Sequence, residues 1–298
     1  MILTLEASPV EEIFWRGGRF FLKRDDRLHP DFSGNKARKF YYFLRRDFPR
    51  VEQIVSYGSP QSNAMYSLSV LAKMRGWRFD YYVDHIPPQL REYPVGNYRA
   101  ALENGTIFHT GIPPESHSDP ATLRVEEGGR QKEAEEGVAL LAQEIIAWRR
   151  ERGIGRLTLF LPSGTGTTAL YLAKHLTRER IDVVTTPCVG NEHYLRLQFA
   201  SLERDATLWP QIVDLPRKYH FGRLYGEFWQ IWLELYRQTG VEFDLLYDPK
   251  GWLTLLKHRA KWPGEILYLH QGGLQGNESM RMRYLRKMAA GSARSIQK

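Results

Sequence analysis

Two stretches of this sequence repeat the order strand, turn, helix and strand. Short apolar runs rich in branched and aromatic residues predict the strands, and apolar residues spaced three and four apart predict the helices. A strand–helix–strand unit joins parallel strands by a right-handed crossover, which leaves the helix packed on the sheet. We therefore expect an α/β chain with two open, mostly parallel sheets. The first unit is expected at residues 51–57, 62–75 and 79–83, and the second at 157–161, 167–175 and 183–186.

Further elements surround these two units. Residues 85–129 are rich in proline, glycine and glutamate and give no clear pattern. A chain of 298 residues exceeds the roughly 250 residues at which single cores stop growing, so two domains are expected. We predict a larger domain from residues 1–48 and 150–298 and a smaller one from residues 49–149. Other strands are expected at 20–23, 243–247 and 266–269, and other helices at 36–46, 131–150, 191–202, 228–239 and 252–259.

The number of cysteines and the length of the apolar stretches indicate in which cellular compartment the protein is expected. The single cysteine, Cys188, cannot form an intrachain disulfide or a multi-cysteine metal site, which fits a reducing environment. The first residues lack the features of a signal peptide, and no apolar stretch reaches the roughly 20 residues that cross a bilayer. No cluster has metal-ligand spacing, and the adjacent Asp25 and Asp26 are expected in a solvated loop. We expect a cytoplasmic protein without a metal or a membrane partner.

The net charge of +8 fits two kinds of partner. A basic protein binds nucleic acid, or it attracts small anions such as a phosphorylated cofactor and amino-acid carboxylates. The basic residues gather between residues 16 and 50 and again from 281 to 298, without zinc-finger, RNA-recognition or basic-zipper patterns. Much of this charge is expected on a solvated surface, so nucleic-acid binding ranks last among the hypotheses.

The run SGNKARK at residues 33–39 places two lysines at a predicted helix start. Gly34 and Asn35 give a tight turn, Lys36 projects from the helix start, and Lys39 follows about one turn later on the same face. A lysine amine is a useful covalent catalyst because it forms an imine with a carbonyl, and the pyridoxal aldehyde is the usual partner. Taken alone, however, the motif favours a basic first turn of a surface helix.

The turn GSPQSN at residues 58–63 precedes the helix of the first unit. Backbone N–H groups at a helix N-terminus attract anions, here a substrate carboxylate, and Ser62 and Asn63 add a hydroxyl and an amide. Serine and asparagine are also the preferred caps of any helix. Without other evidence the capping interpretation is favoured.

The turn PSGTGTT at residues 162–168 occupies the same place in the second unit. Its glycines let the backbone close around a phosphate, its hydroxyls add donors, and the following helix supplies its dipole. It matches neither the Walker pattern nor GxGxxG, yet open α/β sheets bind ligands at such strand ends. Phosphate binding is favoured here over a simple turn capped by Thr167.

These motifs together resemble the aminocyclopropane-carboxylate deaminase and D-cysteine desulfhydrase family, within the tryptophan-synthase-β-like (fold type II) pyridoxal-phosphate enzymes. The match spans roughly residues 20 to 277. GNKxRK followed by QSN is its most specific part, and the later matches are weak singly. The matching segments are Lys23 to Asp26, Gly34 to Lys39, Gln61 to Asn63, Ser163 to Thr168, Tyr225-Gly226, Asp248-Pro249 and Gly272-Gly273.

The resemblance implies a fold and a set of residue roles. It implies two open α/β domains with pyridoxal 5'-phosphate in the cleft between them, and a homodimer. Lys36 would be the Schiff-base lysine and proton shuttle. Tyr225 would line the substrate side. The other implied contacts are Lys39 and the loop of Gly164, Thr165, Gly166 and Thr167 on the phosphate, Asn63 on the phenolic oxygen, and Gln61, Ser62 and Asn63 on the substrate.

The implied activity is that of a lyase or deaminase acting on a small amino acid, with release of a keto acid and ammonia. The sequence departs from the family at several points. Asp248-Pro249 runs into Lys250 without the family's Val-Tyr, so the second active-site tyrosine and the partner of the pyridine nitrogen have no counterpart. Gln271 replaces a threonine and Ala64 a histidine. The alternative is therefore a cofactor-binding relative with altered or little activity and a regulatory role.

Overall fold

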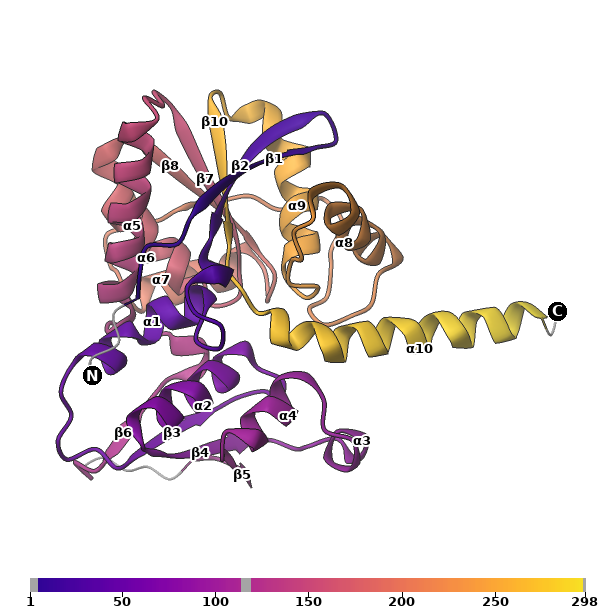
Figure 1. Cartoon of the computed structure of the whole chain (residues 1–298). Helices are drawn as coiled ribbons and strands as arrows, with labels where there is room; N and C mark the ends of the chain where they lie inside the picture. Colours follow the sequence, from indigo (N-terminus) through magenta and orange to yellow (C-terminus); the bar gives the residue numbers. More distant parts are fainter. Residues whose placement is uncertain (1–4, 114–118, 297–298) are drawn as a thin grey trace.

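The computed structural model describes residues 5–113 and 119–296, with side chains described up to residue 290. It contains a six-stranded sheet with the order β1-β2-β10-β7-β8-β9 and a four-stranded sheet with the order β5-β4-β3-β6 (Figure 1). All pairs are parallel except the β1–β2 hairpin. The strands are β1 Val10–Trp15, β2 Gly18–Arg24, β3 Gln53–Tyr57, β4 Arg78–Val83, β5 Ile107–Thr110, β6 Thr122–Arg124, β7 Leu157–Ser163, β8 Ile181–Pro187, β9 Gln211–Ile212 and β10 Glu265–His270. The predicted fold class, two mostly parallel α/β sheets, is confirmed.

Helices cover both faces of the larger sheet. One face packs against α5 and α6, and the other against α8 and α9. Every residue of the central strand β7 is buried, because a parallel sheet covered on both sides leaves no polar face. The helices are α1 Gly34–Arg45, α2 Asn63–Arg75, α3 Pro88–Glu92, α4 Gly96–Glu103, α5 Ala134–Glu151, α6 Thr167–Leu176, α7 Glu192–Ala200, α8 Gly226–Thr239, α9 Asp248–His258 and α10 Asn277–Ile296.

The smaller sheet has a separate core, formed with α1, α2 and α4. The division expected at residues 48 and 149 assigns α1 to the larger domain and α5 to the smaller one. In the structure Phe40 and Phe43 of α1 pack in the core of the smaller sheet, whereas Val138 and Leu141 of α5 pack in the core of the larger sheet. The two helices also contact each other and so join the sheets.

One expected strand needs correction. Residues 243–247 do not form a strand; residues 245–247 form a turn, because the Asp244 carboxylate accepts hydrogen bonds from the N–H groups of Leu246 and Tyr247, both at 2.7 Å. Residues 85–129, which gave no pattern, contain α3, α4 and two short strands, β5 and β6.

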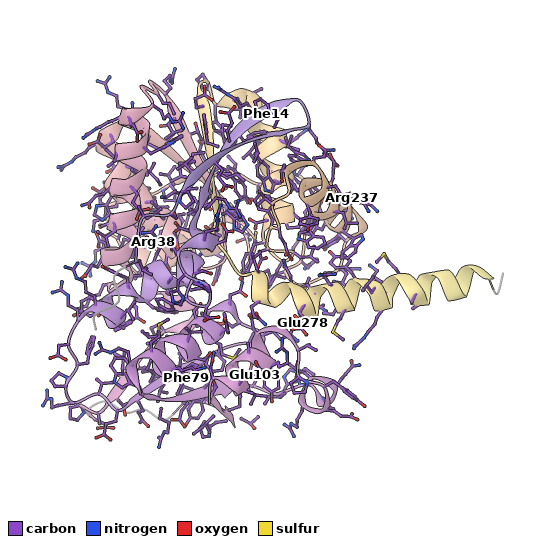
Figure 2. All side chains as sticks on the ribbon, viewed as in Figure 1. Phe14, Arg38, Phe79, Glu103, Arg237 and Glu278 are labelled. Carbon is purple, nitrogen blue, oxygen red and sulfur yellow. The ribbon has the colours of Figure 1, made fainter. Side chains whose placement is uncertain are left out.

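Asp25 is buried and the Asp26 side chain is only 5% exposed, so neither carboxylate lies in a solvated loop. The Arg38 guanidinium donates to both oxygens of Asp25, at 2.9 and 3.1 Å, and also to the Glu144 carboxylate of α5. Lys23 donates to Glu144 as well, at 2.6 Å. This cluster of two cations and two carboxylates ties α1 to β2 and α5, and Figure 2 shows Arg38 in the interior between these elements.

Helix α10 starts on the body of the protein and then projects from it (Figure 1). Met280 and Tyr284 in its first half are buried in the core of the larger domain, whereas Leu285 is 53% exposed. Glu278 at its base, labelled in Figure 2, accepts hydrogen bonds from the Gly96 N–H at 2.8 Å and from Arg99 at 2.9 Å, so it contacts α4 of the smaller domain. No helix among the described residues has both the length and the apolar composition to cross a membrane.

Candidate active site

A cavity of about 900 Å³ lies between the two sheets. Its walls come from segments that follow β3, β7 and β10 and from the starts of α1, α2, α6 and α9. Ligands of open α/β sheets bind at the carboxyl ends of the strands, and this cavity has that position. It contains Lys36, Lys39, Gln61, Ser62 and Asn63, and it also contains the whole loop from Gly164 to Thr168. Among the described residues no cluster of histidine, cysteine and carboxylates could hold a metal ion.

The backbone turn before Lys36 fixes where that lysine lies. Gly34 has φ +68°, and a Cβ atom there would lie 2.0 Å from the backbone oxygen of Gln271. Only glycine allows this approach, so α1 starts in contact with the segment that follows β10. The Asn35 N–H donates to the same Gln271 oxygen at 3.0 Å. The next residue, Lys36, therefore enters the cavity from a rigid support.

The two lysines share one buried environment. Burial lowers the pKa of Lys36 to about 8, although a hydrogen bond with Lys39 and the negative charge of Asp244 oppose this effect. Burial and the nearby Lys36 charge lower the pKa of Lys39 well below its usual value, and its ammonium donates to the Gly128 carbonyl. A lysine with a lowered pKa is partly neutral near physiological pH and can add to a carbonyl. An anion between the two amines would relieve their repulsion.

The turn before α2 caps the helix and also faces the cavity. Ser62 Oγ accepts from the N–H groups of Ala64 and Met65, at 3.1 and 3.4 Å, so the capping interpretation is correct. Gln61, Ser62 and Asn63 nevertheless line the cavity. A Cβ atom at Gly273, where φ is +86°, would lie 2.6 Å from Asn63 Nδ2. The paired glycines after β10 thus leave room for the Asn63 amide.

The loop between β7 and α6 offers unused donors to the cavity. Gly166, with φ +75°, precedes α6, and no side chain caps that helix N-terminus. The buried Thr168 hydroxyl has no hydrogen-bond partner among the described residues. Thr165 and Thr167 are within hydrogen-bonding distance of each other, with 3.1 Å between their hydroxyl oxygens. Buried donors and an uncapped helix start suit an anion, and the sequence analysis did not single out Thr168.

Tyr247, which the sequence analysis missed, also lines the cavity, as does Asp248, which was matched there only to the family's Asp-Pro. Asp248 accepts from the Tyr268 hydroxyl at 2.6 Å and from the Asp244 N–H at 2.9 Å. Burial and the charge of Asp244 raise the pKa of Asp248 well above its usual range, and burial raises the pKa of Asp244 to about 6. The segment in which the sequence comparison found no second active-site tyrosine and no partner for the pyridine nitrogen therefore places a tyrosine and a carboxyl group on the cavity wall.

The segment also fits a second register of the family motif. The family's Asp-Pro-Val-Tyr, acidic residue or threonine, Gly-Lys can be aligned to start at Asp244 instead of Asp248. Tyr247, Asp248 and Lys250 then fall on the tyrosine, the acidic residue and the lysine. Lys250 is buried, and it donates to the Pro187 carbonyl and lies 2.8 Å from an Asp214 carboxylate oxygen. Its position is that of a structural residue, and Asp-x-x-Tyr is the signal that would have located the segment.

Tyr225 is the one predicted site residue that the structure does not bring to the cavity wall. Its ring packs against Tyr219 and Phe228, and its hydroxyl accepts from the His220 N–H at 2.9 Å. Tyr247 lies on the wall of the cavity, with its hydroxyl near Gly164.

Gln271, where the sequence departs from the family, connects two walls. Its side-chain oxygen accepts from Asn35 Nδ2 at 2.8 Å, and its side-chain nitrogen donates to the Pro162 carbonyl at 2.6 Å. The residue therefore joins the turn that carries Lys36 to the start of the Gly164–Thr168 loop.

The sheet order and the position of the cavity define a chain with the tryptophan-synthase-β-like fold, as the resemblance implies. One solved structure with this fold is an ACC deaminase homologue, with a TM-score of 0.76 and 20% identity over 94% of each chain. The processed form of threonine deaminase isoform 2 from Solanum lycopersicum has a TM-score of 0.61 and 10% identity over 90% of this chain and 80% of its own. An O-acetyl serine sulfhydrylase of Entamoeba histolytica has a TM-score of 0.62 and 12% identity over 90% and 86%. Neither a family profile nor a curated protein matches the sequence.

Proposed function

We propose that the cavity binds pyridoxal 5'-phosphate on Lys36 and that the protein is a lyase or deaminase of a small amino acid, releasing a keto acid and ammonia. One observation carries the proposal. The Lys36 amine, with its lowered pKa, shares the cavity with a second buried lysine and with the uncapped start of α6. A lysine that forms an imine and a site for a dianion are the two things that this cofactor requires.

The residues present fit each part of the cofactor. Lys39, the backbone N–H groups from Gly164 to Thr168 and the unpartnered Thr168 hydroxyl would hold the phosphate. Asn63 would donate to the phenolic oxygen. Asp248 offers a carboxylate for the ring nitrogen, and Tyr247 forms part of the wall beside it. When bound, the cofactor supplies an electron sink for the bond that breaks at the substrate carbon.

The remaining residues position the substrate and move its proton. The turn at the start of α2 would bind the substrate carboxylate through the Gln61 amide, the Ser62 hydroxyl and the helix dipole, because the backbone N–H groups of Gln61 and Ser62 already donate to Ser59. Lys36 is the base in the cavity that would take the proton from the substrate α-carbon. Its lowered pKa suits this role near neutral pH.

The binding test uses absorption spectroscopy and covalent trapping. Native protein mixed with pyridoxal 5'-phosphate should develop a visible absorption band, and borohydride should fix the pyridoxyl group on the peptide that contains Lys36. Lys36→Ala should lose both signals, whereas Lys257→Ala, on the partly exposed end of α9 and outside the cavity, should keep them. Absence of the band from the native protein would refute the proposed cofactor.

The reaction is tested with a panel of D- and L-amino acids and a keto-acid assay. The alternative is a cofactor-binding protein with little activity. Its grounds are the departures from the family motif around Lys250 and at Gln271. The presence of Tyr247 and Asp248 on the cavity wall removes the first ground, and so we favour turnover. If the band forms but no substrate yields a keto acid, the alternative holds.

A further inference from the structure

Asn97 of α4 contacts the candidate site without lining its cavity. Its side chain is 1% exposed, and its Nδ2 donates to the Gln61 carbonyl at 2.9 Å and to Asn63 Oδ1 at 2.6 Å. These acceptors belong to the residues on either side of Ser62. One amide of the smaller domain thus holds both sides of the turn that starts α2.

Asp244 holds the other end of the Asn63 amide. Asn63 Nδ2 donates to Asp244 Oδ2 at 3.2 Å. An ionised carboxylate only accepts hydrogen bonds, and the Asn97 NH2 group only donates them. A flipped Asn63 amide would put oxygen against the carboxylate and nitrogen against the NH2 group. The two neighbours therefore fix which end of Asn63 faces which side.

The second N–H of Asn63 remains for a ligand, because Asn63 lines the cavity and Asp244 takes only one of its two hydrogens. The backbone at Gly276 packs closely against the pair of amides. A Cβ atom at Gly276 would lie 3.2 Å from Asn63 Oδ1 and 3.3 Å from Asn97 Nδ2. The buried Asn97 Oδ1 has no partner among the described residues, and a buried unpaired acceptor is costly. Both Asn97 donors are nevertheless directed at the turn.

We propose that Asn97 is a positioning residue for the cofactor: with Asp244 it orients the Asn63 amide so that its free N–H points at the phenolic oxygen of pyridoxal phosphate. This inference rests on the proposed cofactor. It gives a role to a residue of the sequence region 85–129, which carried no recognisable motif.

The predicted effects concern binding and proton affinity. In Asn97→Asp the carboxylate has no N–H to donate, so it faces two acceptors, and Asn63 must turn away. Loss of a hydrogen bond to a charged oxygen should weaken cofactor binding by about ten- to a hundredfold. It should also raise, by about one unit, the pKa of the proton shared between the Lys36 nitrogen and the phenolic oxygen, since a donated N–H favours the deprotonated oxygen.

The experiment measures pyridoxal-phosphate affinity by fluorescence titration and the pH dependence of the visible band. Asn97→Ala, which is neutral, separates the loss of positioning from the effect of a new charge, and both variants should shift in the same direction. Asn104→Asp is the matched control, because Asn104 caps the far end of α4, bonds Ser69 and Lys73, and lies outside the cavity. Circular dichroism of the cofactor-free proteins shows whether each variant folds. If Asn97→Asp or Asn97→Ala does not fold, Asn97→Ser replaces it in the measurements.

The outcomes are distinct. The inference is supported if the native protein forms the visible band and if only the Asn97 variants bind the cofactor more weakly and shift the pH dependence of that band. Native affinity and an unchanged pH profile in those variants would overturn it while leaving the proposed cofactor intact. If the native protein itself forms no band, the proposed cofactor fails, and this inference fails with it.

Discussion

Replacement of Gly34 by alanine tests whether the turn before Lys36 depends on close backbone contact. Two costs add in this variant. The residue has φ +68°, and an L-residue in that conformation costs about 1–2 kcal/mol. The new Cβ would also lie 2.0 Å from the Gln271 backbone oxygen and 2.7 Å from its carbonyl carbon. Overpacking against atoms that cannot move aside costs about 1–3 kcal/mol more. We expect a total of about 2–5 kcal/mol.

Gly76 supplies a matched control for the backbone cost alone. It ends α2 with φ +70°, and nothing lies within 4 Å of a Cβ placed there. Gly76→Ala should therefore cost about 1–2 kcal/mol and leave cofactor binding unchanged. The difference between the two variants isolates the contact between Gly34 and Gln271.

Urea unfolding followed by tryptophan fluorescence gives both free energies, and a titration with pyridoxal phosphate gives the effect on the site. Gly34→Ala should lose most of its cofactor affinity, because α1 must move away from the segment after β10 and carry Lys36 with it. If Gly34→Ala unfolds at the same urea concentration as Gly76→Ala and binds the cofactor as the native protein does, the argument from close contact is wrong.

Three further predictions concern individual residues. Gln271→Ala removes the side-chain bridge from Asn35 to Pro162 and should lower the free energy of unfolding by about 1–3 kcal/mol in urea titrations, with weaker cofactor binding. Arg38→Ala leaves Asp25 without its buried guanidinium and should cost about 3–5 kcal/mol by the same measurement, whereas Arg46→Ala, whose ion pair with Glu136 is on the surface, should cost less than about 1 kcal/mol. Reductive methylation of the cofactor-free protein should modify Lys36 half-maximally near pH 8, because the amine is protonated and unreactive below its lowered pKa. Half-maximal modification near pH 10.5 would contradict the lowered pKa of Lys36.

The fold was predictable because its signals are local and repeated. Each strand–helix–strand unit has its own apolar pattern, and the parallel pairing follows from the crossover rule alone. The strands and helices expected at residues 157–161, 167–175 and 183–186 correspond to β7, α6 and β8. The domain boundaries depend instead on which sheet α1 and α5 pack against, and those contacts are made with residues distant in the sequence.

The site was predictable where a short motif carries its chemistry and not where contacts are distant in sequence. Lys36, Lys39 and the two strand-to-helix turns meet in one cavity as expected. Asn97 had no signal, because its role comes from two hydrogen bonds to a turn more than thirty residues earlier in the chain. Thr168 belongs to the PSGTGTT turn, but the sequence does not show that its hydroxyl is buried without a hydrogen-bond partner among the described residues.

The segment after α8 shows why a motif must be read with its local geometry. Asp248-Pro249 matched two letters of the family motif, yet proline at the second residue of α9 is a common helix start and carries no chemistry of its own. Asp244 has the distinguishing geometry: its carboxylate closes the turn by accepting from Leu246 and Tyr247, and it also bonds Asn63. A residue that both shapes the turn and reaches across the cavity constrains Tyr247 and Asp248 together. The register that starts at Asp244 is therefore the one that explains how this turn contributes to a binding site.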